Sequence, residues 1–173
     1  AFTASVYADI EIDLASPNGD LQWTDVRTSG AAHGRAAVTQ HGLLVHACDT
    51  SRIQGISVKG DYLYEGIYYK GDTELIKQLA LVGCDFEFSS GATYAVKIGG
   101  NAYAVYRNTF DVAEFLGSSL STPSSFYFAS NAKNNTLANA TMIMYKYVDA
   151  GEFNGFDGHL GYDEASFVTG TAI

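Results

Sequence analysis

Alternation of apolar and polar residues over the first fourteen positions limits what this chain can fold into more than any other feature of its sequence. Every even-numbered residue from Phe2 to Leu14 is apolar, and the odd-numbered residues between them are polar apart from the amphipathic Tyr7. A period of two is typical of a β-strand that buries one face. Since most strands have only five or six residues, the pattern predicts one long strand or two strands joined at a bulge.

Further short apolar runs predict more strands, because Gly, Ser, Asn or Asp separates most of them. They lie at 43–47, 53–58, 62–69, 85–89, 125–129, 141–148 and 165–169. The segments 93–98 and 102–107 flank Gly99, Gly100 and Asn101, and this arrangement predicts a β-hairpin. Two helices are also predicted. One covers 111–117 behind an Asp111 cap, and the other covers 73–82, where a strand is the open alternative.

Many short strands at such spacing favour an all-β fold, and we predict an antiparallel β-sandwich, jelly-roll-like, with one or two short helices. No linker and no internal repeat is apparent, so residues 1–173 are predicted to form a single domain. Two short stretches, 1–6 and 161–170, resemble the terminal strands of C1q/TNF-like domains. That resemblance implies the same jelly-roll fold and assigns no functional residue.

The charge balance excludes some classes of partner. The chain has 10 Lys and Arg residues against 19 Asp and Glu residues, which gives a formal net charge of −9. Without a basic stripe, neither nucleic acid nor an anionic membrane surface is an expected partner. No apolar window approaches the roughly 18 residues of a spanning helix, so no membrane span is expected.

Three carboxylates alternate along the first predicted strand, at Asp9, Glu11 and Asp13. Paired carboxylates carry out glycoside hydrolysis, so these residues are the candidates for a hydrolase. A solvated outer face is the preferred interpretation, and we leave the question of an enzyme open while favouring a protein that is not one.

Acidic residues also gather near the C-terminus, where Asp149, Glu152, Asp157 and Asp163 lie among several glycines. Calcium takes six to eight oxygen ligands from flexible loops of this kind. The spacing is not that of an EF-hand, so an ordinary polar loop is preferred and calcium is the one cofactor considered.

Three histidines and a cysteine fall close together, at His33, His41, His46 and Cys48. Their spacing matches no compact metal motif, so polar loop histidines are the preferred interpretation. Two alternatives remain for Cys48 and Cys84. Either they form a disulfide, which fits an extracellular setting, or both are free buried thiols.

Aromatic residues supply the remaining candidates. Tyr62, Tyr64, Tyr68 and Tyr69 form a cluster, and Trp23 is the single tryptophan. Tyrosines serve both sugar-binding faces and protein interfaces, although strands favour them for packing as well. These five residues are the predicted ligand-binding set, with glycans as the possible ligand.

Three functions follow from these patterns. The first is a non-catalytic structural or assembly protein, such as a virion or surface-appendage subunit or decoration protein, that self-associates or binds a partner through strand edges and Tyr-rich faces. It implies a homo-oligomer or larger assembly outside the cell or on a virion or cell surface. The alternatives are a carbohydrate-binding, lectin-like module, with or without calcium, and a glycoside hydrolase using Asp9, Glu11 or Asp13.

Overall fold

The computed structural model describes most of the chain as a stack of parallel β-strands. It covers residues 8–14, 22–24, 27–29, 40–90, 92–111, 114–117, 125–143, 146–160 and 166–169. Within these ranges there are eighteen strands and no helix. The richness in strands matches the sequence prediction, whereas the antiparallel β-sandwich, the jelly roll and the short helices are wrong.

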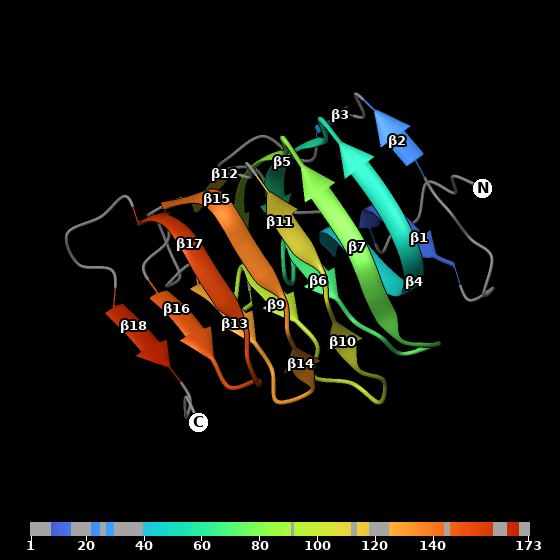
Figure 1. Cartoon of the computed structure of the whole chain (residues 1–173). Helices are drawn as coiled ribbons and strands as arrows, with labels where there is room; N and C mark the ends of the chain where they lie inside the picture. The colour runs from blue at the N-terminus through green and yellow to red at the C-terminus, as the bar shows by residue number, and fades with distance from the viewer. Residues whose placement is uncertain are drawn as a thin grey trace.

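One face of the stack, here called sheet A, consists of short parallel strands. Each pairs with a strand that lies one turn further along the chain (Figure 1). In spatial order its strands are β1 (Ala8–Asp13), the first half of β4 (His41–Gln54), β6 (Ile67–Tyr69), β9 (Val96–Ile98), β13 (Ser125–Phe128), β16 (Lys146–Asp149) and β18 (Ser166–Thr169).

The other face, sheet B, is wider and is bent by corners within each turn. Its strands are β2 (Gln22–Thr24), β3 (Arg27–Ser29), the second half of β4, β5 (Ser57–Tyr62), β7 (Ile76–Val82), β8 (Asp85–Ser90), β10 (Val105–Tyr106), β11 (Thr109–Asp111), β12 (Glu114–Gly117), β14 (Ala132–Lys133), β15 (Thr136–Ile143) and β17 (Gly155–Leu160). Because β4 runs from sheet A into sheet B, the two faces belong to one continuous coil.

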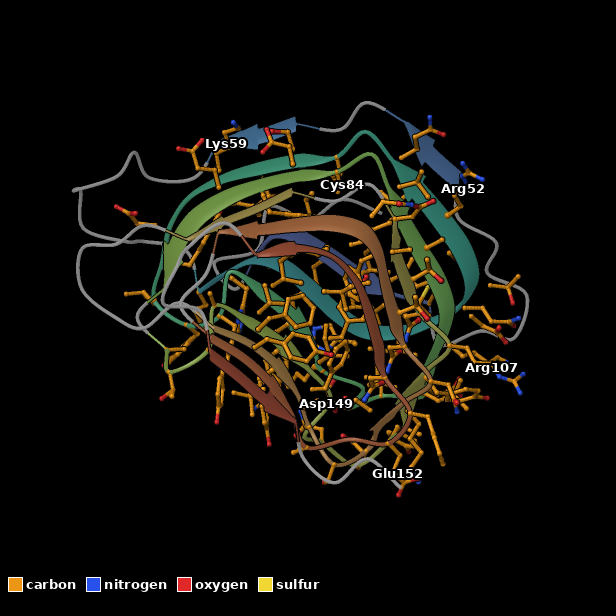
Figure 2. The ribbon with its side chains drawn as sticks, turned by 60° about the vertical axis from the view of Figure 1, so that its left-hand side comes forward. Arg52, Lys59, Cys84, Arg107, Asp149 and Glu152 are labelled. Atoms are coloured by element: carbon orange, nitrogen blue, oxygen red, sulfur yellow. The ribbon has the colours of Figure 1, made fainter. Side chains whose placement is uncertain are left out.

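The register shows that the architecture is a β-solenoid. Ile67 pairs with Val96 and Val96 with Phe126, so equivalent residues recur after 29 and then 30 positions. Figure 2 shows the successive coils around a space that side chains fill. A solenoid buries its core by stacking coils, and every pair of neighbouring strands here is therefore parallel.

The predicted hairpin is wrong, because its two halves lie in different sheets. Val96–Ile98 pairs in sheet A, and Val105–Tyr106 pairs in sheet B. The amide of Gly99 donates to the carbonyl of Tyr69 in the previous coil, at 2.8 Å, rather than across a tight turn. Gly99 and Gly100 have φ of 84° and 98°. The glycines therefore form a corner of the coil, which requires the same positive φ as a hairpin turn.

Neither predicted helix forms, and at 73–82 the strand that the sequence left open as the alternative is confirmed by β7. Gln78 has a left-handed backbone, with φ of 53°, in the middle of β7. Ile76 and Leu79 on either side of it both point into the core. This extra residue turns the period of two into a spacing of three, and that spacing imitates a helix. At 111–117 the chain instead forms the end of β11 and then β12, and 112–113 lie outside the described residues.

Aromatic rings fill the part of the core behind sheet A. Phe110 meets Phe126 edge to face with ring centroids 5.7 Å apart. Phe126 in turn lies 5.1 Å from Phe128 and 6.2 Å from Tyr147. All four side chains are nearly inaccessible to solvent. Rings stacked in register from coil to coil hold the two sheets together through dispersion and burial of apolar surface.

Candidate functional site

The outer face of β1 carries the three carboxylates that the sequence singled out. The exposures along the strand alternate, with Asp9, Glu11 and Asp13 on the open side. Each carboxylate binds a different part of the fold. Asp9 accepts a hydrogen bond of 2.9 Å from the hydroxyl of Tyr62, and Asp13 accepts one of 2.9 Å from Thr73. These contacts tie the first coil to the second and third.

Glu11 belongs to a charged cluster centred on His46. The Nε2 atom of His46 lies 2.9 Å from Oε1 of Glu11, and its Nδ1 atom lies 2.6 Å from Oδ1 of Asp72. The second oxygen of Asp72 contacts the ammonium of Lys70 at 2.5 Å. Although partial burial opposes it, hydrogen bonds from Lys70 and His46 hold the pKa of Asp72 below its usual value. The carboxylate therefore remains ionised in mildly acidic solution.

The predicted tyrosine cluster does not form one surface. Tyr62 and Tyr69 are buried. Burial also raises the pKa of Tyr69 well above its usual value. Tyr64 is 51% exposed at the turn between β5 and β6, and Tyr68 is 8% exposed on sheet A. Trp23 lies in β2, and its side chain is outside what the structure describes. Tyr64 and Tyr68 both contact the ring of His41, at centroid distances of 5.8 Å.

The register adds two outward residues to Tyr68, and the three together are here called the face row. Tyr68 pairs with Lys97, and Lys97 pairs with Tyr127 in the next coil. The ammonium of Lys97 lies 4.8 Å from the centre of the Tyr68 ring, within the range of a cation–π contact. Tyr94 stacks on Tyr127 with centroids 4.2 Å apart and planes inclined by 11°. The face row and Tyr94 therefore lie in register across three coils of sheet A, with Lys97, Tyr94 and Tyr127 partly exposed and Tyr68 buried beneath Lys97.

Burial and a hydrogen bond hold Tyr68 in place within the face row. The side-chain amide of Asn101 donates to its hydroxyl at 2.7 Å. Burial, together with the negative charge of Glu65, raises the pKa of Tyr68 to about 12. The phenol is therefore neutral over the physiological range and acts as a hydrogen-bonding group, not as an anion.

The acidic residues predicted to bind calcium have other partners where the structure describes them. One oxygen of Asp149 accepts hydrogen bonds from the amide of Gly151 at 2.8 Å and from Asn154 at 2.9 Å. Glu152 forms an ion pair of 2.8 Å with Lys133, and Figure 2 shows Glu152 at the outer edge of the coil.

The rest of the calcium prediction lies beyond the described side chains. Only the backbone of Asp157 is described, and Asp163 is outside the described residues. Among the described residues no group of three His, Cys, Asp or Glu side chains could hold a metal ion.

Cys48 and Cys84 are free thiols, both buried. Burial raises the pKa of Cys84 to about 11, and the thiol lies 3.5 Å from the carbonyl oxygen of Val82. Of the two alternatives that the sequence left open, the structure therefore contains the reduced pair. Thiols in such surroundings are poor nucleophiles, because the thiolate is disfavoured.

Sequence reasoning missed Asp72, Lys97, Tyr94 and Tyr127 as members of this surface. Each lies one coil from a residue that it contacts, and nothing local in the sequence connects them. The sequence signal that could have found them is the repeat itself, which a comparison of the chain with itself at an offset of 27 to 30 residues would search for.

Comparisons with known proteins give this chain no relative. No family model matches it, and neither a curated protein nor a solved structure is significantly similar. No helix among the described residues is long and apolar enough to cross a membrane. What the molecule does has to be argued from its own surfaces.

Proposed function

We propose that this chain is a non-catalytic structural protein that associates through the edge strands of its solenoid. One observation carries the proposal. Among the described residues, strands in the middle of the stack pair on both sides, whereas β1 pairs only with β4 and β18 only with β16 (Figure 1). An unpaired row of backbone amides and carbonyls is a template for a strand from another molecule.

The two edges differ in the residues that they present. Three of the six residues of β1 are carboxylic acids, whereas β18 reads Ser-Phe-Val-Thr and contains no charged residue. Charged residues on an edge strand oppose association, and an uncharged strand rich in apolar and β-branched residues favours it. We therefore assign the association to the β18 edge.

A charge placed in β18 tests this assignment. Val168→Lys is expected to weaken self-association at least about tenfold, because it adds a desolvation penalty to the contact. Sedimentation velocity and native mass spectrometry measure the change, and circular dichroism verifies that the strands remain. The matched control is Val148→Lys, since Val148 pairs with Val168 one coil further inside the stack.

Two results would count against the proposal. One is a wild-type protein that stays monomeric at concentrations of about 100 μM, above the range of weak specific association. The other is equal loss of association in both lysine variants, which would place the contact on the face of sheet A and not at its edge.

A second candidate function, recognition of a glycan, is favoured by the face row. Tyr68, Lys97 and Tyr127 cross the coils in register, and Tyr94 widens the aromatic surface. Aromatic rings with polar tips are suited to the faces and hydroxyls of sugars. An extended polysaccharide crossing the strands would contact each coil in turn.

Binding to a glycan array, with and without added calcium, tests this candidate. Tyr127→Ala is expected to reduce binding about tenfold or more, because it removes one of the two stacked rings, Tyr94 and Tyr127, of the surface. Tyr103→Ala is the control, since Tyr103 is 43% exposed but lies in the loop between β9 and β10. Equal effects of the two variants, or an array without any signal, would remove the glycan from consideration.

A further inference from the structure

One outward-facing position of sheet B has the same unusual backbone conformation in successive coils. At this position the chain bulges outward and the residue that follows turns back toward the core. The φ angles lie between 51° and 56°, and the strand register aligns the position from coil to coil. The residues, here called the bulge row, are all exposed, and in order they are Thr50, Gln78, Arg107, Asn134 and Phe153.

The choice of residues in the bulge row is not explained by the bend itself. Glycine adopts a left-handed backbone without a steric penalty, whereas most other residues rarely adopt it. At the next bend of the coil, positive φ falls on Gly55, Gly83 and Asn139. In the bulge row only Asn134 is of a type that often tolerates this backbone, and the β-branched Thr50 is an outlier. Strain retained in coil after coil indicates that the side chains themselves are used.

The charges beside the bulge row leave its middle electropositive. Two ion pairs of 2.8 Å lie toward its ends, Lys77 with Asp49 and Lys133 with Glu152. Between the two lysines the equivalent position is occupied by Tyr106, without an acid. No described side chain pairs with the guanidinium of Arg107, and Figure 2 shows this side chain extending away from the coil. An unbalanced cation therefore faces solvent on a protein whose net charge is −9.

We propose that the bulge row is a binding site for an extended polysaccharide that carries carboxylate groups. Arg107 binds a carboxylate of the sugar chain through two parallel hydrogen bonds. The hydroxyl and amide groups of the polar neighbours in the row exchange hydrogen bonds with sugar hydroxyls. Phe153, which is 70% exposed, offers its ring to the apolar face of a sugar. This site is separate from the strand edges and from the face row.

The composition of the row favours a polysaccharide over other anionic chains. A nucleic acid or a strongly acidic peptide presents a charge on every unit, and its binding surface gathers several free cations. The bulge row offers one free cation among uncharged groups, which suits a ligand with few charges and many hydroxyls. Strands of neighbouring coils lie about 4.8 Å apart, so the row forms a line of about 19 Å. An extended chain laid along it contacts each coil in turn.

Calorimetric titration with oligoglucuronate and oligomannuronate, each compared with its methyl ester, tests the site. The ester keeps the ring hydroxyls and removes the charge. The acid forms are expected to bind at least about tenfold more tightly than the esters, which is the effect of one charge-assisted pair. Arg107→Gln should abolish this difference. Arg52→Gln should retain it, because Arg52 is an exposed arginine of β4 that lies away from Arg107 in Figure 2.

A glycine variant separates binding from folding. Gln78→Gly is expected to raise the midpoint of thermal unfolding, because glycine accepts a φ of 53° without a Cβ clash. It should also weaken binding of the acid forms about fivefold, since it removes one hydrogen-bonding amide.

Four results would overturn the proposal. They are no binding of either acid form at about 1 mM, equal effects of the two arginine variants, full binding by Gln78→Gly, and a lower unfolding midpoint of that variant. Polyglutamate that binds as tightly as the acid oligosaccharides would overturn the polysaccharide and assign the row to an acidic peptide.

Discussion

At the scale of single residues, buried asparagine side chains connect neighbouring coils through hydrogen bonds. Asn108 and Asn135 are fully buried and lie in neighbouring coils. The side-chain oxygen of Asn135 accepts from the backbone and the side chain of Asn108, and its amide donates to the carbonyl of Val105 and to Asn154. The three asparagines form a ladder with every amide engaged, which a buried polar network requires to be stabilising.

Replacing Asn135, the middle residue of this ladder, should destabilise the fold. Asn135→Ala is expected to lower the free energy of unfolding by about 2–3 kcal/mol, because it leaves buried groups of Asn108 and Val105 without their partners. The shift of the urea midpoint measures it. Asn139→Ala is the comparison, since Asn139 is exposed and makes one side-chain hydrogen bond, to Asp111; its effect should remain below about 1 kcal/mol. Equal effects would show that the ladder adds nothing.

At the scale of elements, the sequence located strands well and their partners poorly. Alternation at 8–13 and the apolar runs at 43–47 and 125–129 lie on observed strands. The direction of pairing was not readable, because the same Gly and Asn residues form hairpin turns and coil corners. The repeat was hidden since equivalent positions change chemistry. Leu79 lies one coil from the equivalent Asn108, and the two differ in polarity.

The contact between β4 and the turn before β6 gives a prediction for an element. A Cβ at Gly42 would lie 2.6 Å from Cγ1 of Val58 and 2.8 Å from the carbonyl oxygen of Gly66. Gly42→Ala is therefore expected to destabilise the fold by about 1–3 kcal/mol through overpacking. Gly155→Ala is the control, because a Cβ there meets nothing within 4 Å. Thermal unfolding of both variants decides the matter, and a Gly42→Ala protein as stable as the control would contradict this packing.

At the scale of the whole molecule, backbone pairing joins each described coil only to its neighbours. The backbone of β7 pairs with β4 on one side and with β10 and β11 on the other. No described strand pairs with a strand two coils away. Stability in such a stack is a sum of coil terms and nearest-neighbour terms. The face row and the His46 contacts were unpredictable for the same reason, since they join residues that only the stacking brings together.

This organisation predicts graded protection against hydrogen exchange. Amides of β7 and β9, which have partners on both sides, are expected to exchange at least about tenfold more slowly than those of β18, which pairs only with β16 among the described residues. Exchange mass spectrometry under native conditions measures the profile. Uniform protection across the three strands would show instead that the solenoid unfolds as one cooperative unit.

The last two coils contain fewer residues than the coils before them, and this difference limits what the molecule can build. Phe126 pairs with Tyr147 21 positions later and Lys146 with Ser166 20 positions later, whereas Ala8 pairs with His41 33 positions later. Head-to-tail growth would set a narrow last turn on a wide first turn and leave part of the wide turn uncovered at each junction. Two identical narrow ends fit each other without a mismatch. The shape thus favours a closed, two-fold symmetric pair over an open filament.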